Sequence, residues 1–275
     1  MEGFNPPRKI VQLVSETAQA KCKLSWLQLV ILGILAGAYI GFGAELSTIV
    51  TYDMSERLGS GMARFMAGSV FSVGLMLVVI GGAELFTGNC LMALGLAGGK
   101  IPYMKMAKNW FWVYLANFVG ALVLVGIMFA AGLWKVGGMG VGIRAMEIAS
   151  SKCNLGWWEA LFRGIGCNWL VCLAVWLAMS SNSIVGKIFG IYFPIMAFVA
   201  SGFEHSIANM YFIPMGIFLK TTLVAAKSGL DLVNLSWGGF LLRNLIPVTI
   251  GNIIGGAFFV GILYRMVYLR KNESS

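Results

Sequence analysis

Residues 81–89 read GGAELFTGN and residues 201–209 read SGFEHSIAN, so one pattern occurs twice in the chain. When the two stretches are aligned, the shared positions are Gly82 and Gly202, Glu84 and Glu204, Gly88 and Ala208, and Asn89 and Asn209. Each stretch puts small and polar residues into the middle of a long apolar run. Since a helix break frees backbone groups that hydrocarbon cannot solvate, we expect both breaks to line a polar cavity. Two packing kinks are the alternative interpretation.

The runs around these stretches indicate a membrane protein. Of the 275 residues, 59% are hydrophobic and 11% are charged, and the mean hydropathy is +0.82. About a quarter of the residues in a soluble domain are charged. The apolar runs cover residues 26–50, 62–98, 109–134, 157–180, 188–220 and 239–267. A crossing needs about 20 apolar residues, so we predict an all-α protein with six transmembrane helices in a single transmembrane domain, residues 1–275.

A second repeated pattern predicts how the six helices are organised. Asn109, Asn117 and Gly120 in the third run have the same spacing as Asn244, Asn252 and Gly255 in the sixth run. Two matched patterns in the same order imply a duplicated three-helix unit, with residues 26–134 as the first repeat and 157–267 as the second. Because three is odd, the second repeat must be inverted. Inverted repeats with broken helices, here the second and fifth, place a substrate path near the midplane.

The charges and the N-terminal segment predict the orientation. Residues 1–25 form an amphipathic segment suited to a helix on the membrane surface. Slightly more lysine and arginine residues lie on the side that holds both termini, which favours cytoplasmic termini. This count places Glu2, Arg270, Lys271 and Glu273 inside, and Glu45 on the opposite side. The net charge of +9 suits the attraction of anions and forms no basic arm for nucleic acid.

Other functional classes find little support in the sequence. The five cysteines include no C-x-x-C pair, so we expect no disulfide framework and no metal site. One histidine cannot complete a metal cluster or a catalytic triad, and no phosphate-binding loop occurs, so we expect neither an enzyme nor a cofactor. The single histidine near the membrane midplane also disfavours a membrane scaffold or receptor, because neither class requires such a residue. Gly33, Gly37 and Gly41 form a double G-x-x-x-G motif that permits close helix packing, within or between protomers.

The two breaks contain the residues most suited to chemistry. His205 is the sole histidine, and it can donate to an anion or exchange a proton. Thr87, in the other break, offers a hydroxyl or serves as a helix cap. A structural histidine is the alternative for His205, and an ordinary interfacial lysine is the alternative for Lys152. Phe71, Leu75 and Phe198 are either core residues or dry constrictions.

Three stretches carry a resemblance to a known family. VIGGAELFTGN (79–89), GIGCNWLVCLA (164–174) and FEHSIANM (203–210) resemble the signature motifs of the formate/nitrite transporter family, and the similarity runs from about residue 10 to residue 268. The resemblance implies an aquaporin-like protomer with six helices in inverted repeats, a homo-pentamer with one pore in each protomer, and cytoplasmic termini in the inner (plasma) membrane. It also implies transport of small monovalent anions such as formate, nitrite or hydrosulfide.

The resemblance also implies roles for individual residues. Thr87 and His205 would be the central polar pair, with Glu204 and Asn209 bonding around the histidine and Asn252 supporting the centre. Two constrictions would be lined by Phe71, Leu75, Leu85, Phe86, Val171 and Phe198. Lys152 and Asn168 would form an outer positive site that attracts the anion.

These expectations combine into a mechanism and leave two alternatives. An anion loses hydration in a dry constriction at a cost of several kcal/mol, so a proton from His205 would let it cross as the neutral acid. Formate is the first choice of substrate because ANMYFIPMG (208–216) resembles the formate-type members, while nitrite and hydrosulfide remain open. A channel for water, glycerol or ammonia is the rival, although the Asn-Pro-Ala pair of aquaporins is absent.

Overall fold

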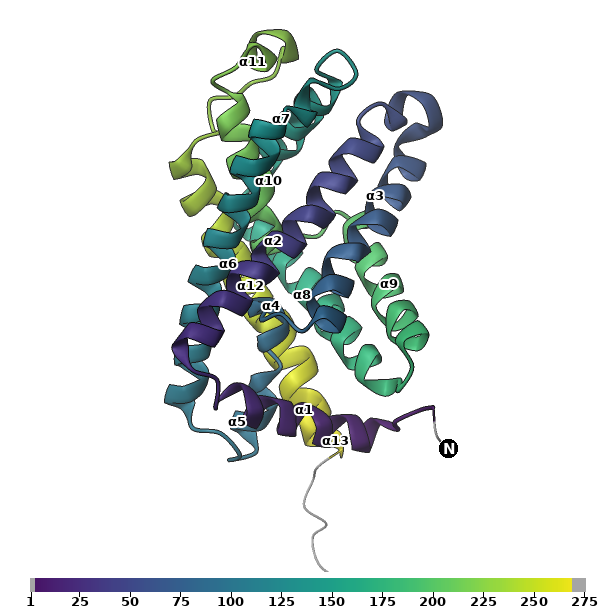
Figure 1. Cartoon of the computed structure of the whole chain (residues 1–275), viewed down its shortest axis with the longest axis vertical. Coiled ribbons are helices and arrows are strands. Elements are labelled where there is room, and N and C mark those ends of the chain that lie inside the picture. Colours follow the sequence, from purple (N-terminus) through teal and green to yellow (C-terminus); the bar gives the residue numbers. More distant parts are fainter. Residues whose placement is uncertain (1–2, 269–275) are drawn as a thin grey trace, which may run out of the picture.

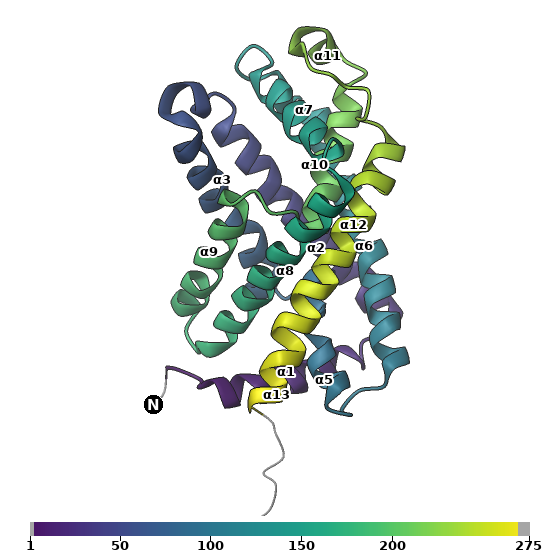
Figure 2. The same cartoon turned by 180° about the vertical axis from the view of Figure 1, so that it is seen from behind.

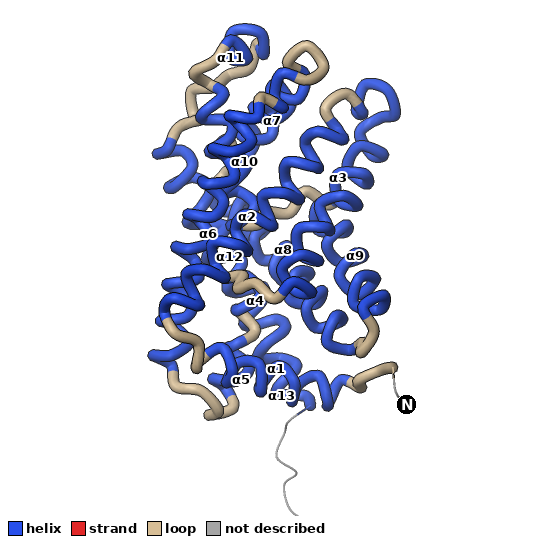
Figure 3. Tube along the Cα trace, viewed as in Figure 1, coloured by secondary structure: helices blue, strands red, loops and turns tan. Residues whose placement is uncertain are grey.

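The computed structural model describes residues 3–268, which are helical apart from turns, loops and an isolated bridge between Phe4 and Ser181 (Figure 3). The first half contains α1 (Pro7–Lys21), α2 (Trp26–Thr51), α3 (Met54–Gly81), α4 (Phe86–Asn89), α5 (Met92–Ala97), α6 (Tyr103–Ala131) and the short η1 (Leu133–Lys135). The second half contains α7 (Gly140–Cys153), α8 (Trp157–Ser180), α9 (Ile184–Ala200), α10 (Ser206–Leu219), α11 (Leu223–Ser228), η2 (Gly239–Leu245), α12 (Ile246–Ile253), η3 (Ile254–Ile262) and α13 (Leu263–Tyr268).

Five of these segments are long and apolar enough to cross a membrane by length and composition. They are Trp26–Thr51, Met54–Gly81, Tyr103–Ala131, Trp157–Ser180 and the continuous stretch Gly239–Tyr268. The remaining expected crossing, residues 188–220, is divided between α9 and α10, and neither is long enough to span alone. The broken fifth run is therefore confirmed as two shorter helices.

A glycine ends the helix before each break. Gly82 closes α3 with φ +82°, and Gly202 follows α9 with φ +77°. Glycine adopts this left-handed conformation without the steric cost that other residues meet. The chain then continues without regular structure until α4 begins at Phe86 and α10 begins at Ser206. Both connections cross the middle of the molecule (Figure 3).

The double G-x-x-x-G motif packs α2 against its own protomer. A β-carbon on Gly37 would lie 2.0 Å from the backbone oxygen of Asn117, and one on Gly33 would lie 2.5 Å from the β-carbon of Ala116. Both neighbours are on α6. Because neither distance leaves room for a side chain, the motif permits the close α2–α6 contact, which settles the choice between packing within and between protomers for these two glycines.

The two ends of the molecule differ. The short helices α1, α5 and α13 lie at one end, and α7 and α11 lie at the other (Figures 1 and 2).

The amphipathic helix α1 differs from the expected surface helix, because Ile10, Val11 and Val14 are buried against the protein. Helix α7 lies between the expected runs and was not predicted. The terminal charges Glu2, Arg270, Lys271 and Glu273 lie outside the described residues.

Candidate functional site

An asparagine anchors the first break to its neighbours. The Asn117 side chain donates to the backbone oxygens of Gly33 (2.8 Å) and Glu84 (2.9 Å). Its Oδ1 accepts the backbone N–H of Phe86, the first residue of α4, at 3.0 Å. Asn117 is fully buried. One side chain thus satisfies three backbone groups, two of them freed by the break, as a buried break requires.

The second break is anchored by the same set of bonds. The Asn252 side chain donates to the backbone oxygens of Gly164 (2.8 Å) and Glu204 (2.9 Å). Its Oδ1 accepts the backbone N–H of Ser206, the first residue of α10, at 2.9 Å. Asn252 therefore holds the second break, and the spacing it shares with Asn117 corresponds to a shared arrangement of hydrogen bonds.

The glutamate of the first break is buried among polar partners. Glu84 Oε2 accepts from Asn89 Nδ2 at 2.8 Å, and Asn89 Nδ2 also donates to Asn109 Oδ1 at 2.8 Å. Lys21, the last residue of α1, forms an ion pair with Glu84 Oε1. The negative charge is thus compensated by a lysine from the N-terminal helix, and the hydrogen bond from Asn89 satisfies the remaining carboxylate oxygen.

The glutamate of the second break has matching partners. Glu204 Oε2 accepts from Asn209 (2.7 Å) and from Asn244 (3.1 Å), and Lys152 Nζ lies 2.8 Å from Glu204 Oε1. Asn209 also donates to Asn244 Oδ1 at 2.6 Å. The structure therefore places Glu204 and Asn209 around Lys152 and Asn244, whereas the resemblance implied that they bond around His205.

Thr87 and His205 meet at the centre, between the two breaks. Thr87 Oγ1 lies 2.9 Å from His205 Nε2, and the two side chains are 0% and 2% exposed. His205 Nδ1 accepts the backbone N–H of Ala208 at 3.0 Å and so caps α10. Since a backbone N–H can only donate, the neutral ring carries its proton on Nε2 and donates to Thr87.

Asn168 lies at this centre. The resemblance had implied that it lies beside Lys152. Asn168 Nδ2 donates to the backbone oxygens of Asn252 (2.7 Å) and Thr87 (3.2 Å), and Asn168 is fully buried in α8. Lys152 instead projects from α7 and pairs with Glu204. The structure does not bring Asn168 and Lys152 together, because they lie on different helices with the second break between them.

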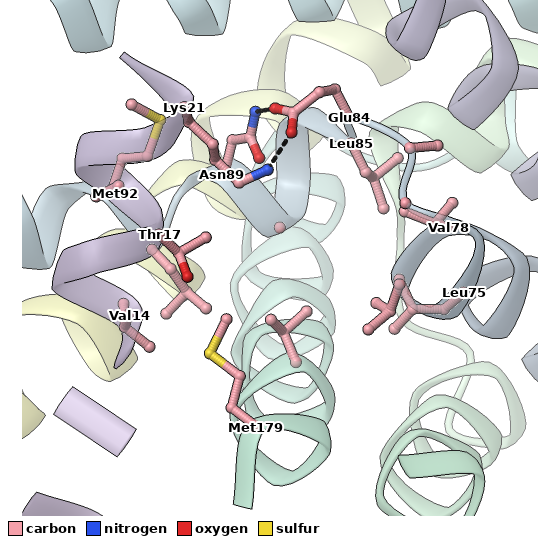
Figure 4. Close-up of a pocket in the computed structure, with 17 residues that line it drawn as sticks. Val14, Thr17, Lys21, Leu75, Val78, Glu84, Leu85, Asn89, Met92 and Met179 are labelled. Atoms are coloured by element: carbon pink, nitrogen blue, oxygen red, sulfur yellow. Dashed lines mark hydrogen bonds and ion pairs between the residues drawn. The ribbon is translucent and has the colours of Figure 1, made fainter. Parts of the chain in front are cut away.

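A cavity of about 220 Å³ lies on the side of the centre that holds α1 (Figure 4), and we term it the α1-side cavity. Val14 of α1 faces Leu75 across it, and Lys21 and Glu84, which pair with each other, also line it. Its charged lining residues are one lysine, Lys21, and one glutamate, Glu84. Leu75 and Leu85, two of the predicted constriction residues, contribute apolar walls.

A second cavity of about 380 Å³ lies on the side that holds α7, and we term it the α7-side cavity. Phe71, Phe198 and His205 are among its lining residues. The rings of Phe71 and Phe198 meet edge to face with centroids 5.6 Å apart. This aromatic contact beside the histidine suits the other predicted constriction.

Two predicted constriction residues lie elsewhere. The Phe86 ring packs against Tyr114 and Trp110 of α6, with centroid distances of 4.8 Å and 5.9 Å. It lines an apolar groove between α6 and α12, away from both cavities. Val171 is buried in the core and lines neither cavity. Leu85 and Phe86 are adjacent in the first break, yet their side chains face different parts of the structure.

A buried pair escaped the sequence analysis. Tyr211 of α10 donates its hydroxyl to Glu45 Oε2 of α2 at 2.6 Å, and the two residues are 1% and 6% exposed. Glu45 was counted with the surface charges because it lies near the end of an apolar run. Local sequence spacing could not have revealed the pair, because Tyr211 lies 166 residues from Glu45.

The arrangement combines several broken and unbroken apolar helices, two cavities and a buried hydrogen-bonding pair between them. It defines a membrane transport protein. A family model described as formate/nitrite transporter matches residues 8–266, and the chain belongs to this family. The resemblance noted in the three sequence motifs is therefore confirmed.

Named relatives and solved structures are similar to this chain. A probable formate transporter from Methanothermobacter thermautotrophicus is 44% identical over 98% of this chain and 99% of the relative. Formate channel FocA from Escherichia coli (strain K12) is 38% identical over 99% of each chain. A solved pentameric formate channel with formate bound matches with a TM-score of 0.80, at 36% identity over 89% of this chain and 98% of that one. These relatives are channels and transporters, not enzymes.

Proposed function

We propose that this protein carries formate across the membrane through a path in each protomer, which runs between the two cavities past Thr87 and His205. The observation that carries this proposal is the buried pair between the Thr87 hydroxyl and His205 Nε2 at 2.9 Å. Both groups are able to donate a hydrogen bond to a small carboxylate. The names of the relatives, among them formate channel FocA, support formate as the substrate.

The proposed path belongs to a six-crossing, aquaporin-like protomer with inverted repeats. The support comes from two matched hydrogen-bond sets, in which Asn117 and Asn252 hold the breaks. The helix pair α9 and α10 supplies the sixth, broken crossing. We further propose a homo-pentamer in the inner membrane with both termini cytoplasmic. The pentameric assembly of the solved formate channel supports the oligomer.

The charged residues suggest how an anion enters. On each side a lysine stands next to the break, Lys21 in one cavity and Lys152 in the other. Each lysine has a glutamate partner, so no unpaired charge is left in the membrane, and the remaining N–H donors of the lysine can bond the anion. Beyond the lysines, Leu75 and Leu85 on one side and Phe71 and Phe198 on the other exclude water.

At the centre, His205 donates from Nε2 and the hydroxyl of Thr87 can rotate to donate as well. Passage as the neutral acid requires a proton, and His205 can give one up only after it has become doubly protonated. Protonation at Nδ1 requires the loss of the bond from the Ala208 N–H, which caps α10. Proton coupling at His205 therefore implies a local change at the first turn of α10.

The substrate is tested by measuring flux in proteoliposomes. We expect fast formate flux and little glycerol flux, because the donors at the centre favour an anion and the constrictions exclude hydrated solutes. Parallel assays with nitrite, hydrosulfide and chloride establish the preference within the family. Faster nitrite or hydrosulfide flux would replace formate as the substrate, and glycerol or water flux without anion flux would favour a neutral-solute channel.

A further inference from the structure

The α7-side cavity is lined by more basic than acidic side chains. Its lining includes four basic side chains, which come from three helices: Arg64, Arg144, Lys152 and Arg163. Glu204 is the carboxylate among the lining residues, and it is paired with Lys152. The α1-side cavity has one lysine and one glutamate. Three arginines are therefore left without a carboxylate inside the cavity.

Apart from a 3.4 Å bond from Arg163 Nη1 to the Gly202 backbone oxygen, the partners of these arginines lie outside the cavity or are missing. Arg144 Nη1 bonds Glu147 at 3.0 Å, and Arg163 pairs with Glu159, but both glutamates are at least 41% exposed and neither lines the cavity. Arg64 forms no ion pair with any residue in the described range 3–268. In the same range, Arg144 Nε is buried without a hydrogen-bond partner. Since an arginine has five N–H donors, most of the guanidinium donors remain unused.

We propose that the α7-side cavity binds a small divalent oxyanion, either a dicarboxylate or phosphate, through Arg64, Arg144 and Arg163. Planar guanidinium groups match carboxylate and phosphate oxygens in a bidentate geometry. The side chains of Glu147 and Glu159 are 41% and 50% exposed, so water screens their pairs with the arginines and leaves part of the positive charge to a divalent anion. The volume of about 380 Å³ accommodates such a ligand together with water.

The divalent anion stays in the cavity. The Phe71 and Phe198 rings lie at the wall beside His205, and two charges lose more hydration than one in such an apolar constriction. Bound there, the anion blocks the entry of a permeant anion from the α7 side. The binding step stands on the arginines alone, and the competition with transport rests on the proposed function.

Binding is tested with radiolabelled succinate and, in parallel, radiolabelled phosphate, using the purified full-length protein in detergent at low ionic strength. We expect saturable binding of at least one of them, with acetate as a weak competitor. The double variant Arg144→Gln/Arg163→Gln should bind about tenfold more weakly or worse, because charge-assisted hydrogen bonds are lost. Arg64→Gln, an exposed position, provides a second variant if the double variant does not fold.

The matched control is Lys135→Gln/Lys227→Gln, which removes the same charge from exposed positions outside the cavity. This variant should bind as the wild type does. Absence of saturable succinate and phosphate binding, or an equal loss in both double variants, would overturn the proposal. Formate flux that persists in the wild type while neither ligand binds would overturn this inference and leave the proposed function standing. Binding without any reduction of formate flux would overturn the placement of the anion on the transport path.

Discussion

The two breaks share a scaffold and differ in the residues that face the centre. Asn117 and Asn252 make the same three bonds, and each glutamate binds the asparagine five positions later and a lysine. The residue after each glutamate, however, is Leu85 in one break and His205 in the other. The repeated bonds satisfy the backbone groups that each break exposes. The residues that differ between the two breaks form the polar centre.

The same division appears on α2 and α8. Asn117 bonds the Gly33 oxygen as Asn252 bonds the Gly164 oxygen, so Gly37 and Asn168, four residues later, are equivalent. At Gly37 a β-carbon would lie 2.0 Å from the Asn117 oxygen, whereas Asn168 Nδ2 bonds the Asn252 oxygen at 2.7 Å. One half thus uses close packing where the other half adds an amide donor to the centre.

Removal of the anchoring asparagines should have the largest effect. In Asn252→Ala, the Glu204 backbone oxygen and the Ser206 N–H lose their partner, and each orphaned group costs about 1–3 kcal/mol, or about 2–6 kcal/mol in sum. Asn117→Ala should destabilise the protein equally. Thermal unfolding of the purified protein in detergent measures both changes. The control is Asn234→Ala, at a half-buried loop position, which removes a single side-chain hydrogen bond to Asn154 and orphans no group in a break. Normal stability of either anchor variant would break the equivalence of the two breaks.

The lysines sharpen the comparison, because their burial differs. The Lys152 side chain is 13% exposed and that of Lys21 is 21% exposed, so water compensates less for a loss at Glu204 than at Glu84. Loss of one partner costs about 3–5 kcal/mol in a fully buried pair, and we expect about 2–3 kcal/mol for Lys152→Met and less for Lys21→Met. The same unfolding assay tests this order. Glu204→Gln should recover part of the loss in Lys152→Met, and a greater effect of Lys21→Met would contradict the burial argument.

The Glu45–Tyr211 pair has no equivalent in the other half of the molecule, because Leu91 occupies the position that corresponds to Tyr211. Tyr211→Phe removes the donor to a buried carboxylate and should cost about 1–2 kcal/mol. The double variant Tyr211→Phe/Glu45→Leu should be more stable than Tyr211→Phe, because both polar groups are then gone. Unfolding midpoints of the two single variants and the double variant provide the test. Purely additive effects would show that the two groups do not interact.

The sequence predicted the local features of the site better than its contacts. Gly82 and Gly202 mark helix ends because backbone conformation depends on the residue itself, and the repeated glutamate and asparagine positions predicted a repeated arrangement. The ion partners could not be predicted, since Lys21 and Glu84 are 63 residues apart and Lys152 and Glu204 are 52 apart. Asn168 was assigned to the wrong neighbours for the same reason: its partners, two backbone oxygens, come from other helices.

The most direct test of the account is the pH dependence of formate flux in the wild type and in His205→Gln. Glutamine retains a donor near Thr87 but does not titrate. We expect wild-type flux to rise as the pH falls, because His205 can pass on a proton only after it has become doubly protonated, and we expect the profile of the variant to be flat. An unchanged pH profile in His205→Gln would contradict a role for the histidine proton in the passage of formate.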